Sequence, residues 1–233
     1  DGSQLTNLPS SGADSPFSYN SNEAGGIEVT NYTTASGSSA FAVGNDNLAS
    51  GSSSTALGRG TIASGDVSLA IGGDTIASGD FSTAMGDRTT ASGNYSTAMG
   101  EGTTASGDDS IAMGSYTTAS GGTSTAMGTS TTASDNSSLV IGHFNLSGST
   151  VPANAADFSL DNTAFVVGNG TASNNRSDAL VVKFNGDAAL AGNLNINSDA
   201  RLKANIISLG STLAKLLQID GKSYTMKKDE NKK

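Results

Sequence analysis

Residues 77–90 of this 233-residue chain read ASGDFSTAMGDRTT, and residues 91–104 repeat the pattern as ASGNYSTAMGEGTT. The same phase extends in both directions. Ala-Ser-Gly begins at positions 35, 49, 63, 77, 91, 105 and 119, and Ala-Ser-Asp begins at position 133. Eight copies without an insertion or deletion predict units that stack on one another, because a slipped unit would break a stack but would cost nothing in a flexible linker.

A second glycine keeps the same 14-residue step, and a large apolar residue precedes it each time. These glycines stand at positions 44, 58, 72, 86, 100, 114, 128 and 142. Two glycine positions per repeat predict two short strands and two turns, with strands at 81–85 and 88–91 in the first repeat quoted. The glycines are expected to supply the positive φ that tight turns need. Threonine pairs and two glycines per repeat disfavour a helix.

The strand at 81–85 has two faces of different character. Period-two alternation places Thr83 and Met85 on one face, and Ser82 and Ala84 on the other. We expect the Thr, Leu, Ile and Met positions to fill the coil, and the Ser and Ala positions to lie near a shared axis, because small residues suit close approach of neighbouring chains. Each coil offers too little apolar area to hold a single-chain solenoid, so the repeat predicts an oligomer.

The composition excludes several functional classes. Hydrophobic residues make up 35% of the chain and aromatic residues 5%, whereas 30 residues are glycine. The absence of cysteine excludes disulfides, Cys-ligated zinc, iron–sulfur clusters and thiol catalysis. The single histidine, His143, is expected to be a polar surface residue, so we predict no metal site and no cofactor. No apolar run has the roughly 18 residues that would predict a membrane-spanning helix.

The charge divides the chain. The net charge of −9 makes nucleic acid a poor partner. Residues 35–142 carry nine acidic and two basic residues, whereas residues 198–233 carry four acidic and eight basic ones. We therefore expect an N-terminal segment at 1–34, a repeat domain at 35–142, a β-rich connector or stem at 143–197 and a basic tail at 198–233. The start at Asp1, without Met or a signal peptide, is expected of a processed or cut fragment.

The repeat resembles a known family. Residues 68–72 (SLAIG), 96–100 (STAMG) and 110–114 (SIAMG) are similar to the Ser-x-Ala-Ile-Gly repeat of YadA-like trimeric autotransporter heads, which share the 14-residue period. The resemblance implies an all-β fold, a left-handed parallel β-roll of 14-residue coils that is homotrimeric and displayed at a bacterial surface for adhesion. Met often stands where the family has Ile, which keeps the volume but softens the packing.

The repeat ends near Gly142, and shorter strands are expected beyond it. We predict strands at 163–168, 179–184 and 188–196, with Asn185-Gly186 as a hairpin turn. Residues 174–179 (NNRSDA) and 192–194 (GNL) resemble segments of tail-fibre and adhesin stems, although less specifically than the repeat resembles its family.

The tail carries the only candidate catalytic residues. Residues 198–206 (SDARLKANI) resemble the start of the endosialidase-type intramolecular chaperone, peptidase family S74. The resemblance implies trimerisation and self-cleavage at Ser198–Asp199, with Ser198 as nucleophile and Lys203 as base. Trimer burial would lower the lysine pKa and so activate the hydroxyl. The alternative is that Asp199 caps a following element and Lys203 is solvated. Only about thirty residues follow Lys203, fewer than the family's domain needs, and we expect a helix near 211–218.

Together these features predict a homotrimeric fibre protein, either at the surface of a bacterium or in the tail fibre of a phage. Its repeat domain would lie outside the cell and act as a spacer and an adhesive surface. The expected ligand is a molecule of a host cell, of the extracellular matrix or of another surface, and glycans are among the candidates. One alternative is an ice-binding solenoid, with threonine pairs such as Thr89-Thr90 forming a flat array. Another is a glycan-degrading enzyme of the tailspike kind, against which the shortage of aromatic residues and of a clustered carboxylate pair weighs.

Overall fold

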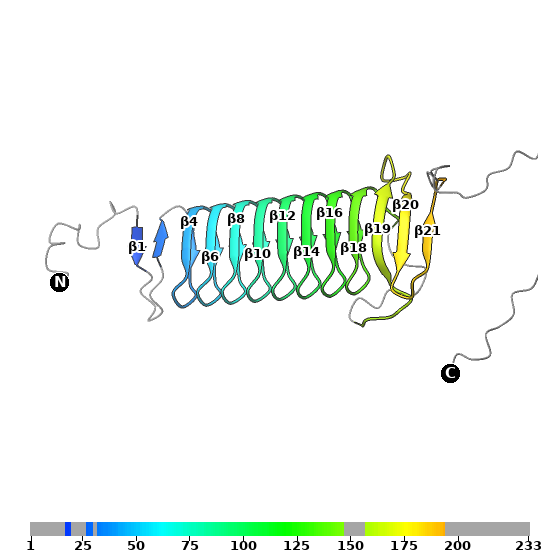
Figure 1. Ribbon diagram of the computed structural model, residues 1–233. Coiled ribbons are helices and arrows are strands. Elements are labelled where there is room, and N and C mark those ends of the chain that lie inside the picture. The colour runs from blue at the N-terminus through cyan, green and yellow to red at the C-terminus, as the bar shows by residue number, and fades with distance from the viewer. Residues whose placement is uncertain (1–16, 20–26, 30–31, 147–156, 194–233) are drawn as a thin grey trace, which may run out of the picture. The chain divides into compact units, whose positions relative to one another are not determined.

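The computed structural model describes residues 17–19, 27–29, 32–146 and 157–193. The chain divides into two compact units, Asp1–Asn193 and Leu194–Lys233, and all of the described residues belong to the first. They form strands and turns without a helix (Figure 1). Accordingly, this part of the chain includes no helix with the length and hydropathy needed to cross a membrane.

Each repeat forms one coil with a five-residue strand and a two-residue strand. The long strands are β4 (Phe41–Asn45), β6 (Thr55–Arg59), β8 (Leu69–Gly73), β10 (Thr83–Asp87), β12 (Thr97–Glu101), β14 (Ile111–Ser115), β16 (Thr125–Thr129) and β18 (Leu139–His143). The short strands are β3 (Thr34–Ala35), β5 (Leu48–Ala49), β7 (Ile62–Ala63), β9 (Ile76–Ala77), β11 (Thr90–Ala91), β13 (Thr104–Ala105), β15 (Thr118–Ala119) and β17 (Thr132–Ala133). The predicted all-β roll of 14-residue coils is therefore confirmed.

Successive coils pair in parallel with a register shift of one repeat. Met85 of β10 lies opposite Met99 of β12, which lies opposite Met113 of β14. The long strands belong to a 13-stranded sheet, and the short strands form a separate 8-stranded sheet. Because the step never varies between β4 and β18, every sequence position becomes a column that runs along the stack, as the evenly spaced arrows of Figure 1 show.

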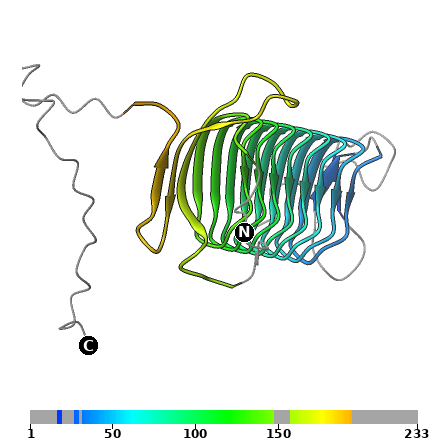
Figure 2. The same ribbon diagram turned by 90° about the vertical axis from the view of Figure 1, so that its right-hand side faces the viewer.

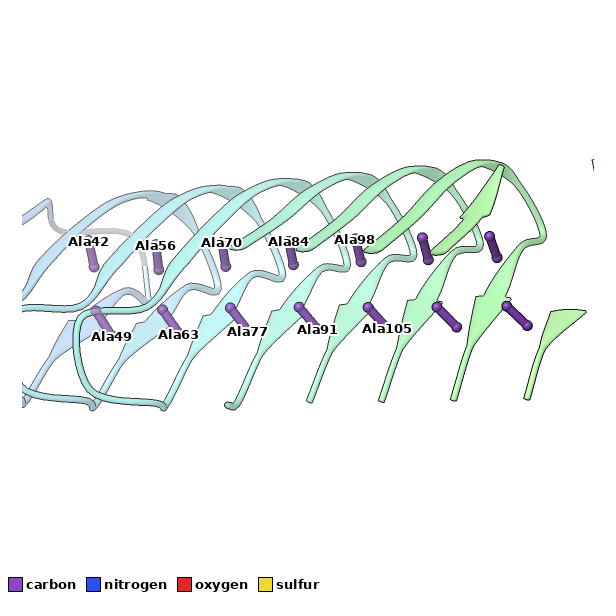
Figure 3. Packing of buried hydrophobic residues seen from close by; sticks show 14 of the residues in the cluster. Ala42, Ala49, Ala56, Ala63, Ala70, Ala77, Ala84, Ala91, Ala98 and Ala105 are labelled. Carbon is purple, nitrogen blue, oxygen red and sulfur yellow. The ribbon is translucent and has the colours of Figure 1, made fainter. Parts of the chain in front are cut away.

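Apart from Asn47, Asp135 and Val140, the interior of the coils contains only small side chains, which corrects the predicted orientation of the strand faces. Ala84 of β10 and Ala91 of β11 point toward each other and are fully buried (Figure 3). Ser82 and Thr89 are also fully buried, whereas Met85 lies on the outside of the coil and is half-buried. Two strands and two turns of 14 residues enclose a narrow space. Ala, Ser and Thr fill it, and the close approach that small residues permit is between the two sheets of one chain.

Two columns of glycine are required because the coils lie so close together. A Cβ on Gly93 would lie 2.1 Å from the carbonyl oxygen of Gly107, and a Cβ on Gly86 would lie 1.9 Å from that of Gly100. Only the column that contains Gly86 has a positive φ, which is +128° at that residue. The prediction that both glycines supply the positive φ of the turns is thus half right, since the column that contains Gly93 is glycine for lack of space.

The turns adopt the left-handed conformation mostly at residues other than glycine, with Gly60 and Gly102 as the exceptions. Phe81 has a φ of 58°, Val67 of 55° and Arg88 of 53°, and the equivalent positions of the other coils behave in the same way. Such a conformation costs an L-residue about 1–2 kcal/mol, so the stacking of the coils must hold it in place. This regular cost is absent from residues 157–193, where the only residue with a positive φ is Gly186.

The stack continues beyond the repeat into the stem, which comprises β19 (Thr163–Asn169), β20 (Asp178–Lys183) and β21 (Ala188–Leu190). β19 pairs in parallel with β18, and Gly142 lies opposite Gly168 although 26 residues separate them. β20 and β21 then add antiparallel strands to the same sheet (Figure 2). The predicted strands at 163–168 and 179–184 and the hairpin at Gly186 are confirmed, but the register of the long strands extends past Gly142.

Side chains, instead of a further strand, terminate the short-strand sheet at its C-terminal end. The amide oxygen of Asn145 accepts from the backbone N–H of Thr132 at 2.7 Å, and its Nδ2 donates to the carbonyl oxygen of Thr132 at 3.0 Å. Asp135 stands where the previous coils have glycine, and its Oδ2 accepts from both the N–H and the hydroxyl of Thr163, at 2.9 and 2.6 Å. These side chains replace the backbone groups that another coil would supply.

The N-terminal end of the long-strand sheet has two further strands. β1 (Phe17–Tyr19) pairs antiparallel with β2 (Ile27–Val29), which pairs in parallel with β4.

Within the repeat, Asn47 takes the place of the buried threonine of later coils. Its Nδ2 donates to the carbonyl oxygens of Val43 and Gly58, both at 2.8 Å, and its Oδ1 accepts from the N–H and hydroxyl of Thr61.

Candidate functional site

The outer face of the long strands carries the largest apolar surface of the repeat. One column, which we call the outer stripe, consists of Val43, Leu57, Ile71, Met85, Met99, Met113, Met127 and Ile141, all half-buried. Beside it run Phe41, Thr55, Leu69, Thr83, Thr97, Ile111, Thr125 and Leu139, of which Ile111 is 36% exposed. Neither column contains a charge. At about 4.8 Å per strand the apolar face is roughly 34 Å long, a size typical of protein–protein contact surfaces.

A second surface is formed by the turns that lead from each short strand to the next long strand, here called the first-turn edge. Asp66, Asp80, Asn94 and Asp108 form a ladder along it, in which the side-chain Oδ1 of each accepts from the backbone N–H of the equivalent residue one coil earlier, at 2.9–3.0 Å. The neighbouring column contains Val67, Phe81 and Tyr95, which are 50–59% exposed. The Phe81 and Tyr95 rings stack at 5.0 Å with an interplanar angle of 3°.

The opposite turns, from each long strand to the short strand of the same coil, form the second-turn edge. Here acids and bases pair: Arg59 with Asp74 at 3.0 Å, and Arg88 with Asp87 at 2.7 Å and Glu101 at 2.6 Å. The hydrogen bond to Asp87, and then that to Tyr116, raises the pKa of Arg88 above its ordinary value. The charges of this edge are therefore largely satisfied within the chain.

The outer face of the short strands bears on the predicted ice-binding array. In each threonine pair of β11, β13, β15 and β17 the first residue, such as Thr89, is buried inside the coil and only the second, such as Thr90, reaches the surface. The pairs therefore do not form a flat two-column array. His143, at the end of β18, is exposed, as predicted for a polar surface residue.

The residues predicted to catalyse self-cleavage, Ser198 and Lys203, and the bond Ser198–Asp199 lie outside the described residues, as does the helix expected near 211–218. Among the residues that are described, His, Asp and Glu side chains do not gather in groups of three or more that could hold a metal ion.

Sequence reasoning missed how the stem attaches to the last coil. The guanidinium of Arg176 donates to the carbonyl oxygens of Ser130 at 2.9 Å and Asn145 at 3.1 Å, and lies 5.8 Å from the centre of the Phe144 ring. The signal was present in the resemblance of residues 174–179 to fibre stems, but that resemblance assigns no partner to Arg176.

A cavity of about 240 Å³ lies beneath the stem strands, where the short-strand sheet has already ended. Val140, Val166 and Val181 line it together with Asp178, whose Oδ1 accepts from the N–H of Leu146 at 3.0 Å. Burial raises the pKa of the Asp178 carboxyl above its ordinary value, and the hydrogen bond from Leu146 partly opposes the shift. The cavity is a packing gap at the end of the β-roll, and both apolar and polar side chains line it.

The comparisons with known proteins match two parts of the chain. The family model described as the YadA head domain repeat, which spans two copies, matches residues 35–61, 63–89, 91–117 and 119–145. The family model described as the chaperone of endosialidase matches residues 198–233. No curated protein matches the chain. Residues 35–145 are therefore similar to the YadA head repeat family, and residues 198–233 are similar to the chaperone of endosialidase family.

Proposed function

We propose that this chain forms part of a homotrimeric extracellular fibre, at a bacterial surface or in a phage tail, whose repeat domain acts as spacer and adhesive surface. The domains are those expected above, with a segment at 1–34, the head at 35–142, a β-rich stem at 143–197 and the chaperone segment at 198–233. Both matched families imply fibrous proteins outside the cytoplasm. The ligand of the fibre is a surface molecule of a cell or matrix.

The observation that carries the trimer is the outer stripe. Its eight apolar residues lie on the outside of the coil, although the interior contains only small side chains. A thin coil of this kind buries little apolar area by itself, and contact between outer stripes would bury the apolar side chains that the coil leaves half-buried. The proposed interface is therefore the face opposite to the one that the sequence suggested. Small residues close the coil, and Met, Ile and Leu join the chains.

Light scattering coupled to size exclusion tests the trimer and its interface. The wild type is expected at three times the mass of its chain, which is 23.0 kDa before any cleavage in the C-terminal segment. Replacing Met99 and Met113 by Asp would place two charges in the outer stripe and is expected to give monomers or unfolded chains. Thr104→Asp with Thr118→Asp, on the outer face of the short strands, is the matched control and should remain trimeric. A stable folded wild-type monomer would overturn the proposal.

We also propose that the C-terminal segment assists trimer assembly and then cleaves itself at Ser198–Asp199. In this reaction Lys203, deprotonated by burial, accepts the proton of the Ser198 hydroxyl, and the hydroxyl oxygen attacks the carbonyl carbon of a Ser198–Asp199 bond. The carbon–nitrogen bond breaks, and the protonated Lys203 gives its proton to the leaving amine of Asp199. Water then hydrolyses the resulting ester and completes the cut. Denaturing mass spectrometry of the purified protein should reveal a chain that ends at Ser198, and Ser198→Ala and Lys203→Ala should leave the chain whole. Identical fragments in all three proteins would contradict the assignment.

A further inference from the structure

The first-turn edge is a surface of the repeat at which four adjacent coils differ from the coils at either end. Coils at either end carry small polar residues there, such as Ser38-Ser39 and Gly122-Thr123. Four adjacent coils between them carry Asp66-Val67, Asp80-Phe81, Asn94-Tyr95 and Asp108-Asp109. At about 4.8 Å per coil this patch, which we call the ridge, is about 14 Å long.

The ridge presents aromatic surface on a rigid backbone. Phe81 and Tyr95 are 50% and 59% exposed and stack on each other in parallel. Their backbone N–H groups donate to the carbonyl oxygens of Asp66 and Asp80, both at 2.8 Å, while the Asp and Asn side-chain ladder holds the adjacent residues. Each turn is therefore fixed to the next by a backbone and a side-chain hydrogen bond. A partner would bind these rings with little loss of chain entropy.

The charge of the ridge identifies the kind of partner. Asp66, Asp80 and Asp108 each use Oδ1 in the ladder, and the structure gives their Oδ2 atoms no partner among the described residues. Asp109 adds a fourth carboxylate. The only basic residues between 32 and 146 are Arg59 and Arg88, and both are on the second-turn edge, where Asp74, Asp87 and Glu101 pair with them. The ridge thus combines four uncompensated negative charges with exposed aromatic rings.

We propose that the ridge is a docking surface for an arginine-bearing segment of another protein. A guanidinium is planar, stacks on aromatic faces and pairs with carboxylates, so it satisfies both features of the ridge. In the column of ring positions Tyr95 is followed by Asp109, so the ring face that is not stacked on Phe81 adjoins a carboxylate. The inference deepens the proposed adhesive function by naming a ligand class, but the ridge lies within a single chain and does not depend on trimer formation.

A binding assay with a defined probe tests the ridge. The probe is a fluorescent peptide of alternating Arg and Gly, and the comparison peptide contains citrulline, which keeps the shape of arginine without its charge. At about 0.15 M salt the wild type should bind the arginine peptide and not the citrulline one. Phe81→Ala with Tyr95→Ala should weaken binding about tenfold, and Asp80→Asn with Asp108→Asn by a similar factor and with a smaller salt dependence.

Matched variants on the second-turn edge separate the ridge from the general negative charge of the chain. Tyr116→Ala removes an exposed ring, and Asp74→Asn with Asp87→Asn removes two charges; each should change binding less than twofold. Equal losses from both edges would overturn the proposal, as would wild-type binding to neutral oligosaccharides that depends on the rings but not on salt. The molecular mass of every variant is measured by light scattering before the binding assay. A ridge variant that loses its trimer mass would place this edge between copies of the chain and would also overturn the proposal, whereas a monomeric wild type that binds would refute only the trimer.

Discussion

The long strands of the regular coils share a sheet with the stem, but the coils and the stem are stabilised differently. In the coils between β4 and β18, every interior residue is Ala, Ser, Thr or Gly apart from Asn47, Asp135 and Val140, and backbone carbonyls occupy the space where a glycine Cβ would lie. In the stem, valines such as Val166 and Val181 pack around a cavity. Where the stem meets the last coil, the side chains of Asp135 and Arg176 supply hydrogen bonds that a further coil would otherwise make. The coil therefore tolerates very little change of volume, whereas the stem depends on particular polar contacts.

The largest expected effect comes from adding one methyl group inside the stack. Gly93→Ala would place its Cβ 2.1 Å from a backbone oxygen and 2.5 Å from a backbone carbon of Gly107, and neither can move without shifting the next coil. We expect a loss of about 3 kcal/mol or more in the free energy of unfolding, measured by thermal melts followed by circular dichroism. Gly192→Ala in the stem, with nothing within 4 Å, is the control and should melt as the wild type does.

Removing the carboxylate cap should have the next largest effect, and it should be confined to the stem. Asp135→Ala leaves the N–H and hydroxyl of Thr163 without their acceptor in a buried position, at a cost of about 2–3 kcal/mol. Asp135→Asn keeps an acceptor oxygen and should lose less. Hydrogen exchange is expected to accelerate in β19–β21 while β8–β12 stay protected, and uniform acceleration would contradict the role of Asp135 as a local cap.

A smaller effect is expected from replacing serines of one column by alanine. The change in the free energy of unfolding should have opposite signs in a regular coil and in the last coil. The Ser96 hydroxyl is buried without a hydrogen-bond partner, whereas the hydroxyl of Ser138, in the last coil, donates to the carbonyl oxygen of Asp135 at 2.8 Å. Ser96→Ala should raise the free energy of unfolding by about 1 kcal/mol and Ser138→Ala should lower it by about 1 kcal/mol. Chemical denaturation measures both, and changes of the same sign would show that the two regions do not differ in this way.

The smallest effect concerns pH and belongs to the stem alone. Because burial raises the pKa of Asp178 in the folded protein, the folded state favours the protonated carboxyl, so this group's contribution to stability is present below its unfolded pKa. That contribution is lost as the pH rises through the raised value. Asp178→Asn keeps an oxygen to accept from Leu146 and should remove this dependence. Melting temperatures of variant and wild type at pH 4 and pH 7 measure it, with Asp161→Asn as the control.

Much of the fold follows from the spacing of a few residue types, but the orientation of the strands does not. The 14-residue step predicted the coils, and the alternation in residues 81–85 correctly separated Thr83 and Met85 from Ser82 and Ala84. Alternation alone does not say which set lies inside. The width of the coil decides that, and the width depends on the approach of the two sheets, which is a tertiary property.

The sequence also predicts in part where the ends of the β-roll lie. Asn47 and Asn145 interrupt the column of buried threonines, and Asp135 interrupts the column of glycines, so each marks a place where the regular stack changes. What the sequence does not contain is the partner of each interruption. Thr163 and Arg176 meet the last coil only because β19 resumes the register after an insertion, and neither spacing nor composition predicts that return.

The C-terminal caps have a consequence for the length of the molecule. Asp135, Asn145 and Arg176 make these contacts only with the last coil and the stem, and every earlier coil meets neighbours that are nearly identical to itself. A whole 14-residue unit can therefore be duplicated or deleted in the middle of the stack without disturbing either end. Gene rearrangement can lengthen or shorten the β-roll in steps of about 4.8 Å without a change in the stem or the tail.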